Sequence, residues 1–234
     1  MQSEREQIAS SVKKGVRETF PVMLAYMSIG TTYGLLAQQS GLGLWAALGM
    51  SVLVYAGTSQ FMAVSMLQSG VEALVIIGSV FMVNFRFLLL SAAVTPHLGG
   101  WKTWKRLLMG GLITDAVFAL HSLNFRRGDM DPAAAVTLNV TAYVTWVIFS
   151  LVGYNLGAMI GNPKVWGLDF ALPALFVGLL LSACGNKAGI AAAVVGGAVS
   201  VKLHLMDAGG WAAFLGALAG ATAGVLLMKG GEDE

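Results

Sequence analysis

An arginine lies in the middle of one of the longest apolar stretches of this chain. The stretch runs from Ala73 to Val94, and Arg86 is its only charged residue. A guanidinium group does not lose its charge, so placing it in hydrocarbon costs roughly 2.5 kcal/mol or more unless a partner or water compensates. We therefore expect Arg86 to lie inside a membrane, next to a polar partner or a cavity that water reaches.

The composition favours an integral membrane protein. Hydrophobic residues make up 56% of the 234 positions and charged residues only 11%, whereas soluble domains carry about 25% charged residues. The net charge of +2 and the lack of an aromatic-rich basic patch exclude nucleic acid as an expected partner. Cys184 is the single cysteine, which excludes an intrachain disulfide and a cysteine metal cluster. With no enzyme motif and three scattered histidines, the sequence predicts no catalytic residue, metal or cofactor.

Eight apolar runs approach the length of about 20 residues that a membrane-spanning helix needs. They predict an all-α, polytopic transmembrane helical bundle of seven to eight hydrophobic segments, one or more of them broken or re-entrant. The runs are Phe20–Gln38, Leu44–Leu67, Ala73–Val94, Leu107–Leu123, Ala133–Ile160, Phe170–Ala183, Ile190–Leu203 and Trp211–Met228.

Basic residues near the segment ends predict the orientation, since short cytoplasmic loops are rich in Lys and Arg. The N-terminal arm is basic, and so is the loop that carries Lys102, Lys105 and Arg106. Three full crossings would put these two regions on opposite sides, so we expect one of the first three runs to be broken. The sequences SIGTTYG (28–34) and YAGTSQ (55–60) favour a break in the first or second run.

The simplest organisation is one membrane domain. We expect a cytoplasmic N-terminal arm over residues 1–19, a transmembrane domain over 20–228 and an acidic tail over 229–234 outside the cell. Seven crossings then place the N-terminus inside and the C-terminus outside. Small residues in FLGALAGATAG (214–224) predict close helix packing, and a second subunit of the same chain is an alternative occupant of that face.

Arg86 and Asn84 are the first candidate site residues. Asp115 is the natural counter-charge of Arg86, because it is the clearest acidic residue inside an apolar run. A structural ion pair and a substrate site remain equal alternatives, and proton coupling by Asp115 is a further one. His121 is expected to be an interfacial residue. Asp169 is expected to cap or kink a helix, with a contribution to the site as a secondary alternative.

The densest polar cluster within an apolar run lies in the second run. Its hydroxyls, amide and backbone groups are suited to binding an ammonium or a carboxylate group, as interrupted helices do in transporters. Hydrogen bonding between helices is the equal alternative. The cluster consists of Tyr55, Gly57, Thr58, Ser59 and Gln60.

Several strings resemble the AzlC-type (azaleucine resistance) family of branched-chain amino acid permeases. They are VYAGTSQFMAV (54–64), FMVNFRFLLLSAAVTPHL (81–98), TDAVFAL (114–120) and LDFALPALFVGLLLSA (168–183). The resemblance extends over nearly the whole chain. It draws attention to Tyr55, Gly57, Ser59, Gln60, Asn84, Arg86, Thr114, Asp115, Asp169 and Pro173. Two positions differ from the family pattern, since Ala116 replaces a frequent glutamate and Leu90 a frequent tyrosine.

The resemblance implies export of valine, leucine or isoleucine across the cytoplasmic (inner) membrane of a prokaryote, together with a small AzlD-type membrane subunit. We expect a secondary transporter, driven by protons or by the membrane potential, because the chain has no nucleotide-binding motif. A non-transporting scaffold or sensor subunit and a channel for small solutes are the alternatives.

Overall fold

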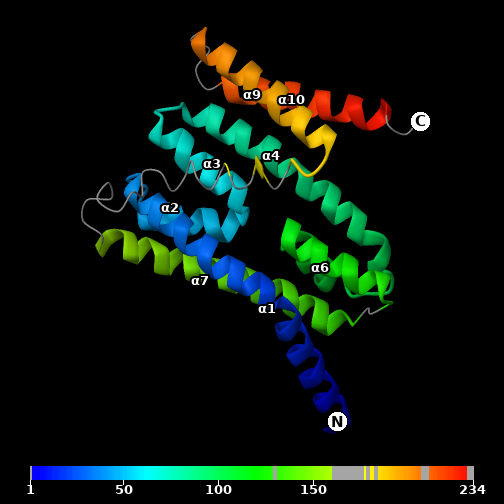
Figure 1. The fold of residues 1–234 in the computed structure, drawn as a ribbon. Coiled ribbons are helices and arrows are strands. Elements are labelled where there is room, and N and C mark those ends of the chain that lie inside the picture. The colour runs from blue at the N-terminus through cyan, green and yellow to red at the C-terminus, as the bar shows by residue number, and fades with distance from the viewer. Residues whose placement is uncertain are drawn as a thin grey trace. The chain divides into compact units, whose positions relative to one another are not determined.

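The computed structural model describes residues 2–128, 131–159, 177, 180, 181, 184–206 and 211–230. All regular structure in these ranges is helical, as predicted. Figure 1 shows the order of the elements along the chain. They are α1 (Gln2–Gln39), α2 (Leu44–Gly49), the π-helix η1 (Met50–Val54), α3 (Gly57–Gln68), α4 (Ala73–Val94), the 3-10 helix η2 (Thr95–Leu98), α5 (Thr103–Gly111), α6 (Asp115–Arg126), α7 (Pro132–Met159), α9 (Lys187–Leu205) and α10 (Trp211–Gly230).

Within the described ranges, four helical stretches are long and apolar enough to cross a membrane. The prediction of seven to eight segments is therefore not confirmed. Pieces of five to twelve residues replace two of the expected runs, and such pieces are shorter than the roughly 20 residues that a crossing needs. The sixth run lies mostly outside the described residues. The four stretches are Arg5–Gln39, Ala73–Leu98, Pro132–Met159 and Lys187–Leu205.

The helix breaks differ from those expected. The second run is interrupted after Val54, but the first run is one continuous helix, so the expectation that SIGTTYG favours a break was wrong. Thr31 and Thr32 there donate to carbonyls one turn earlier, at 2.6 and 3.0 Å, so the hydroxyls are satisfied inside the helix. A break that was not predicted separates α5 from α6 at residues 112–114.

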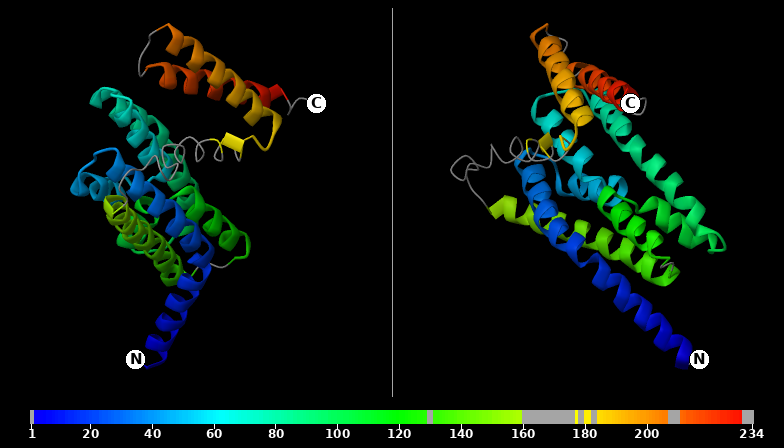
Figure 2. Two further views of the ribbon diagram at one scale, coloured as in Figure 1. Left: turned by 60° about the vertical axis from the view of Figure 1, so that its left-hand side comes forward. Right: turned by 45° about the vertical axis from the view of Figure 1, so that its right-hand side comes forward.

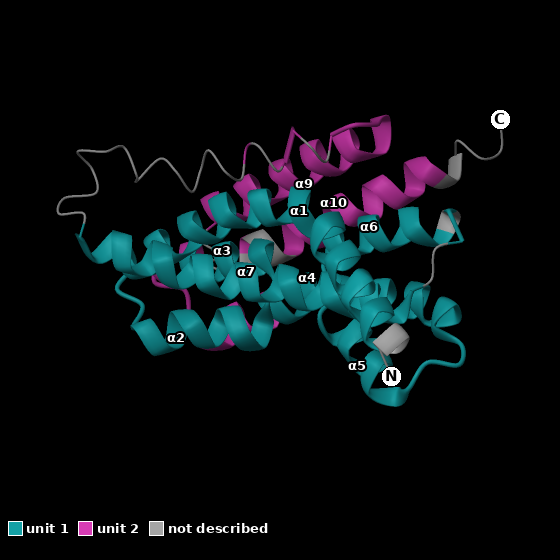
Figure 3. Ribbon diagram, turned by 90° about the horizontal axis from the view of Figure 1, so that it is seen from below, with its two compact units in different colours: residues 1–64, 80–161 teal, residues 65–79, 162–234 magenta. Residues whose placement is uncertain are grey.

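Two compact units make up the chain, coloured teal and magenta in Figure 3. In the first unit (residues 1–64 and 80–161), α1 and α7 lie side by side, as all views in Figures 1 and 2 show. Glycines allow this close approach. A Cβ on Gly34 would collide with the carbonyl group of Ser150, and one on Gly153 with that of Thr31. The small residues thus bring the two helix backbones into direct contact.

The start of α7 is set by Asp131 and the proline that follows it. The Asp131 carboxylate accepts hydrogen bonds from the backbone N–H groups of Ala133 (2.9 Å) and Ala134 (3.4 Å), which caps the helix. Burial of this carboxyl group opposes its ionisation, but hydrogen bonds from Ser11 and from these N–H groups, with the charge of Lys14, hold the pKa of Asp131 below its ordinary value.

The second unit (residues 65–79 and 162–234) contains the pair α9 and α10. The glycines of α10 face α9. A Cβ on Gly216 would collide with the Ser200 hydroxyl group, and one on Gly220 would lie 2.5 Å from the Ala192 carbonyl oxygen. The small-residue face of FLGALAGATAG is therefore used for packing within the chain, the first of the two alternatives.

Candidate functional site

The break in the second run is centred on Tyr55. Its backbone is left-handed (φ 46°, ψ 47°), the one non-glycine residue in the described ranges with a positive φ. This conformation costs roughly 1–2 kcal/mol for a residue with a side chain. The ring is 5% exposed and meets Tyr26 and Tyr143 edge-on, with centroids 6.5 and 4.9 Å apart. Packing therefore holds a strained residue where η1 ends and α3 begins, and such strain clusters at functional sites.

The break in the fourth run ends at Thr114, directly before α6. Thr114 is the N-cap, and its hydroxyl group accepts from the Val117 N–H at 3.4 Å. The same hydroxyl lies 2.7 Å from the hydroxyl of Tyr26 on α1. Asp115 is the first residue of α6, where the helix dipole favours a carboxylate. The sequence Thr-Asp thus both starts the helix and places a negative charge at its N-terminus.

Arg86 of α4 connects the two breaks. Its Nη2 atom lies 3.0 Å from Asp115 Oδ2 and donates to Thr58 Oγ1 at 3.4 Å. It therefore contacts the first turn of α3 and the first turn of α6. The side chains of Arg86 and Asp115 are 39% and 57% exposed, so a small molecule can reach both charges. The guanidinium group has more N–H donors than these two contacts use.

Three buried polar atoms of the predicted site residues have no hydrogen-bond partner in the described part of the chain. They are Tyr55 Oη, Asn84 Oδ1 and Arg86 Nε. Most buried polar atoms in proteins are paired, so each unpaired one calls for an explanation. One is a donor, one an acceptor and the hydroxyl is either. A ligand with both donor and acceptor groups would satisfy them.

The other members of the predicted cluster make contacts within the protein. Ser59 donates to the Ala56 carbonyl oxygen at 3.0 Å. Gln60 is fully buried, accepts from the Trp146 indole N–H at 3.0 Å and donates to Ser51 Oγ at 3.1 Å. A Cβ on Gly57 would lie 2.9 Å from the same indole ring. Gln60 and Gly57 thus pack α3 against Trp146 of α7. Asp169 and Pro173 lie outside the described residues.

The structure adds residues that the sequence analysis did not assign. Tyr26 links Tyr55 to Thr114, although it looked like one more aromatic residue in an apolar run. His121 was expected to be interfacial but is 1% exposed, and its Nε2 lies 2.6 Å from Asn139 Oδ1. The sequence does contain an indication of this pair. His121 and Asn139 each lie inside an apolar run, where a polar side chain needs a partner.

Comparison with known proteins identifies the relatives of this chain. A family model described as "AzlC protein" matches residues 21–160. An uncharacterized membrane protein of Archaeoglobus fulgidus is 30% identical, over 92% of this chain and 93% of the relative. The inner membrane protein YgaZ of Escherichia coli is 25% identical over 83% of each chain. The branched-chain amino acid transport protein AzlC of Bacillus subtilis is 21% identical over 75% of this chain and 68% of the relative. No solved structure matches.

Proposed function

This chain belongs to the AzlC family of multi-pass membrane proteins, and we propose that it is a secondary transporter that exports branched-chain amino acids. The observation that carries the proposal is the accessible ion pair between Arg86 and Asp115, which joins two helix breaks. The printed name of the Bacillus subtilis relative supports the substrate class.

The substrate is a zwitterion, and the site offers one group of each charge. We propose that the substrate carboxylate binds Arg86 while the substrate ammonium binds Asp115, so that the zwitterion separates the pair. Asn84 Oδ1 and Tyr55 Oη, both unpaired, are acceptors for the remaining ammonium hydrogens. The ion pair of Arg86 and Asp115 has no net charge, and neither has the amino acid zwitterion. Binding of the zwitterion between the two side chains therefore adds no net charge at membrane depth, where an unbalanced charge is costly.

The remaining predicted residues complete the proposed site. Thr58 contacts Arg86 directly and orients it, while Gly57, Ser59 and Gln60 form the wall behind it. The ring of Phe87, 5.1 Å from the Arg86 guanidinium carbon, is a candidate contact for the branched side chain. Asp169 is proposed as a second acidic group of the transport pathway.

The cellular arrangement is also part of the proposal. A relative is an inner membrane protein by name, and we place this chain in the cytoplasmic membrane with its N-terminus inside and its C-terminus outside. We propose one transmembrane domain over 20–228, with the arm 1–19 and the tail 229–234. It would act as the large subunit beside a small AzlD-type subunit, driven by protons or the membrane potential.

Leucine counterflow in proteoliposomes tests the function. The chain is reconstituted with and without the small subunit, and labelled leucine is exchanged against unlabelled leucine inside. Saturable exchange whose KM for leucine is strongly raised by Arg86→Gln and by Asp115→Asn is the expected result, with Arg106→Gln, an exposed arginine of α5, as the control. Absence of saturable flux in both preparations would favour a scaffold or sensor, and flux that never saturates would favour a channel.

Two leucine analogues test the role of each charge. 4-Methylpentanoate has the carboxylate without the ammonium, and 3-methylbutylamine has the ammonium without the carboxylate. Both should compete poorly with leucine in the unchanged chain. If Asp115 binds the ammonium, Asp115→Asn should reduce the ratio of the affinity for leucine to the affinity for 4-methylpentanoate. If Arg86 binds the carboxylate, Arg86→Gln should reduce the ratio of the affinity for leucine to the affinity for 3-methylbutylamine. Equal effects of both variants on both analogues would contradict the assignment.

A further inference from the structure

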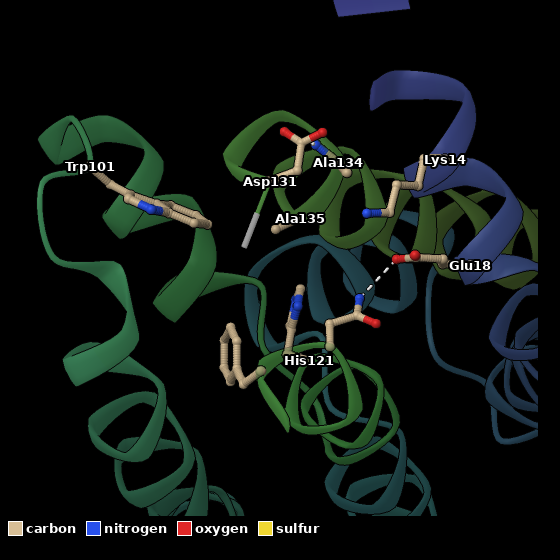
Figure 4. A pocket seen from close by; sticks show the side chains of 9 residues that line it. Lys14, Glu18, Trp101, His121, Asp131, Ala134 and Ala135 are labelled. Carbon is tan, nitrogen blue, oxygen red and sulfur yellow. Dashed lines mark hydrogen bonds between the residues drawn. The ribbon is translucent and has the colours of Figure 1, made fainter. Parts of the chain in front are cut away.

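A second polar site lies in the first unit, away from the ion pair. It is a small pocket between the N-terminal half of α1, the C-terminal half of α6 and the start of α7. In Figure 4 the His121 ring points from α6 towards Ala135 and Asp131, with Trp101 on one side and Glu18 on the other. The polar residues that line the pocket are Lys14, Glu18, His121, Asn124 and Asp131.

The hydrogen bonds around Asn139 fix which nitrogen of His121 exchanges a proton. Asn139 Nδ2 donates to the carbonyl oxygens of Met109 (3.3 Å) and Leu108 (3.4 Å) at the end of α5. Its Oδ1 must then accept from His121 Nε2, at 2.6 Å, so Nε2 carries a hydrogen in either charge state. Nδ1 is therefore the atom that gains or loses a proton.

Charged groups from two helices line the pocket beside the imidazole. Lys14 and Glu18 come from α1 and Asp131 from the start of α7, while the ring of His97 on η2 stacks on Phe125. Glu18 accepts from Asn124 Nδ2 at 2.8 Å, which holds its carboxylate at the pocket. α5 contributes only the backbone carbonyls that orient Asn139. Burial of the ring favours the neutral form of His121, and the Glu18 carboxylate opposes this effect in part by stabilising the charged form.

An aromatic stack connects the buried histidine to an exposed one. The rings of His121 and Phe125 lie 5.9 Å apart at 17°, and those of Phe125 and His97 lie 4.3 Å apart at 3°. A phenyl face stabilises a neighbouring cation. His121 therefore has an aromatic face, a fixed hydrogen-bond acceptor in Asn139 Oδ1 and the Glu18 carboxylate, which together offset part of the cost of burying an imidazolium.

We propose that His121 Nδ1 is the proton-binding site that couples proton movement to transport, distinct from the Arg86–Asp115 pair. The pocket has room for roughly one water molecule, so it admits water and protons but not an amino acid. Nδ1 takes a proton from a hydronium ion in the pocket, which leaves water, and later returns the proton to a water molecule, with the carboxylates of Glu18 and Asp131 lining the same pocket. His121 and Asp115 lie on the same helix, α6, which links the proton site to the substrate site. The inference rests on the proposed transport function.

Nitrogen NMR of the full chain in lipid nanodiscs tests the proton site without any transport. His97→Gln and His204→Gln together leave His121 as the single histidine, labelled with 15N. We expect a neutral ring with its hydrogen on Nε2 and protonation of Nδ1 as the pH falls from 8 to 5. A neutral ring with its hydrogen on Nδ1, or one charge state throughout this range, would overturn the proposal.

Transport then tests the coupling. A gradient of one pH unit supplies about 1.4 kcal/mol per proton, which corresponds to about tenfold accumulation of leucine. His121→Gln should lose this accumulation but keep leucine counterflow, whereas His204→Gln, on the exposed surface of α9, should keep both. Full accumulation by His121→Gln would refute the coupling role. If the unchanged chain shows no counterflow, the transport function fails while the NMR result still decides the proton site. If His121→Gln does not fold, the NMR titration alone decides.

Discussion

Replacement of Gln60 by methionine separates a packing role from a substrate-binding role. Methionine keeps the length of the side chain but removes both polar ends. Trp146 is 3% exposed, so its indole N–H would lose its acceptor without gaining water, at about 1–3 kcal/mol. Ser51 would lose a donor but still donates to Ser150 Oγ at 2.9 Å, so its loss is about 1 kcal/mol. The free energy of unfolding should therefore fall by about 2–4 kcal/mol.

Thermal unfolding of the purified chain measures this change. At about 2–4 °C per kcal/mol for a chain of this size, Gln60→Met should lower the melting temperature by roughly 10 °C. Gln68→Met is the matched control, because Gln68 lies on the same helix α3 and is exposed. It should change the free energy of unfolding by no more than about 0.5 kcal/mol. The double variant Gln60→Met, Trp146→Phe should lose less free energy of unfolding than the two single variants lose in sum, because the second change removes the indole N–H that the first change leaves unpaired.

Leucine counterflow completes the comparison. At a temperature where Gln60→Met is folded, the packing role predicts an unchanged KM for leucine. An unchanged melting temperature with a raised KM would refute the reasoning, because it would mean that Gln60 faces the substrate and that its bonds to Trp146 and Ser51 contribute nothing.

Three further changes test the packing and the charges of the first unit. Gly34→Ala puts a methyl group against the α7 backbone and should lower the free energy of unfolding, measured by thermal unfolding, by about 1–3 kcal/mol. Gly78→Ala, in open space on α4, should raise the free energy of unfolding by up to about 1 kcal/mol. Asp131→Asn should change stability by less than about 1 kcal/mol at neutral pH, because asparagine also caps helices. Since the folded-state pKa of Asp131 is lowered, the unchanged chain should lose that ionic stabilisation as the pH falls below about 4, and the variant should not. A double-mutant cycle of Arg86→Gln and Asp115→Asn should give a coupling of about 0.2–1 kcal/mol, the range of part-exposed pairs, and zero coupling would contradict the contact.

The sequence predicted long apolar helices well and helix breaks poorly. The predicted bounds of the third run, Ala73–Val94, coincide with α4, because an uninterrupted apolar run has one low-energy form in a membrane. In SIGTTYG the polar residues were interpreted as a weak point. Hydroxyl groups of Thr31 and Thr32 instead bond to their own helix, and Gly34 packs against α7. A polar residue in an apolar run therefore does not by itself predict unwinding.

The contact between Arg86 and Asp115 was predictable from the residue types, but the geometry around it was not. Arg86 and Asp115 were picked out because each charge at membrane depth needs a partner. Periodicity carries no information on Tyr26, whose ring and hydroxyl group contact both breaks from a third helix. It also does not show that Gln60 is turned towards α7 and that Thr58, two residues earlier, is turned towards Arg86. These are consequences of how helices pack, which one sequence does not specify.

The arrangement of the two breaks explains why one arginine is central to the proposed site. Arg86 lies on α4, which is unbroken, while Thr58 and Asp115 each lie in the first turn of a helix that starts at a break. A first turn has backbone N–H groups without helical partners, so it can change direction with little loss of hydrogen bonding. Arg86 is the contact shared by the two turns. A ligand that takes over its guanidinium group would therefore remove one contact from α3 and one from α6 at the same time, and we expect binding of the proposed substrate to change the orientation of the first turns of both short helices against α4.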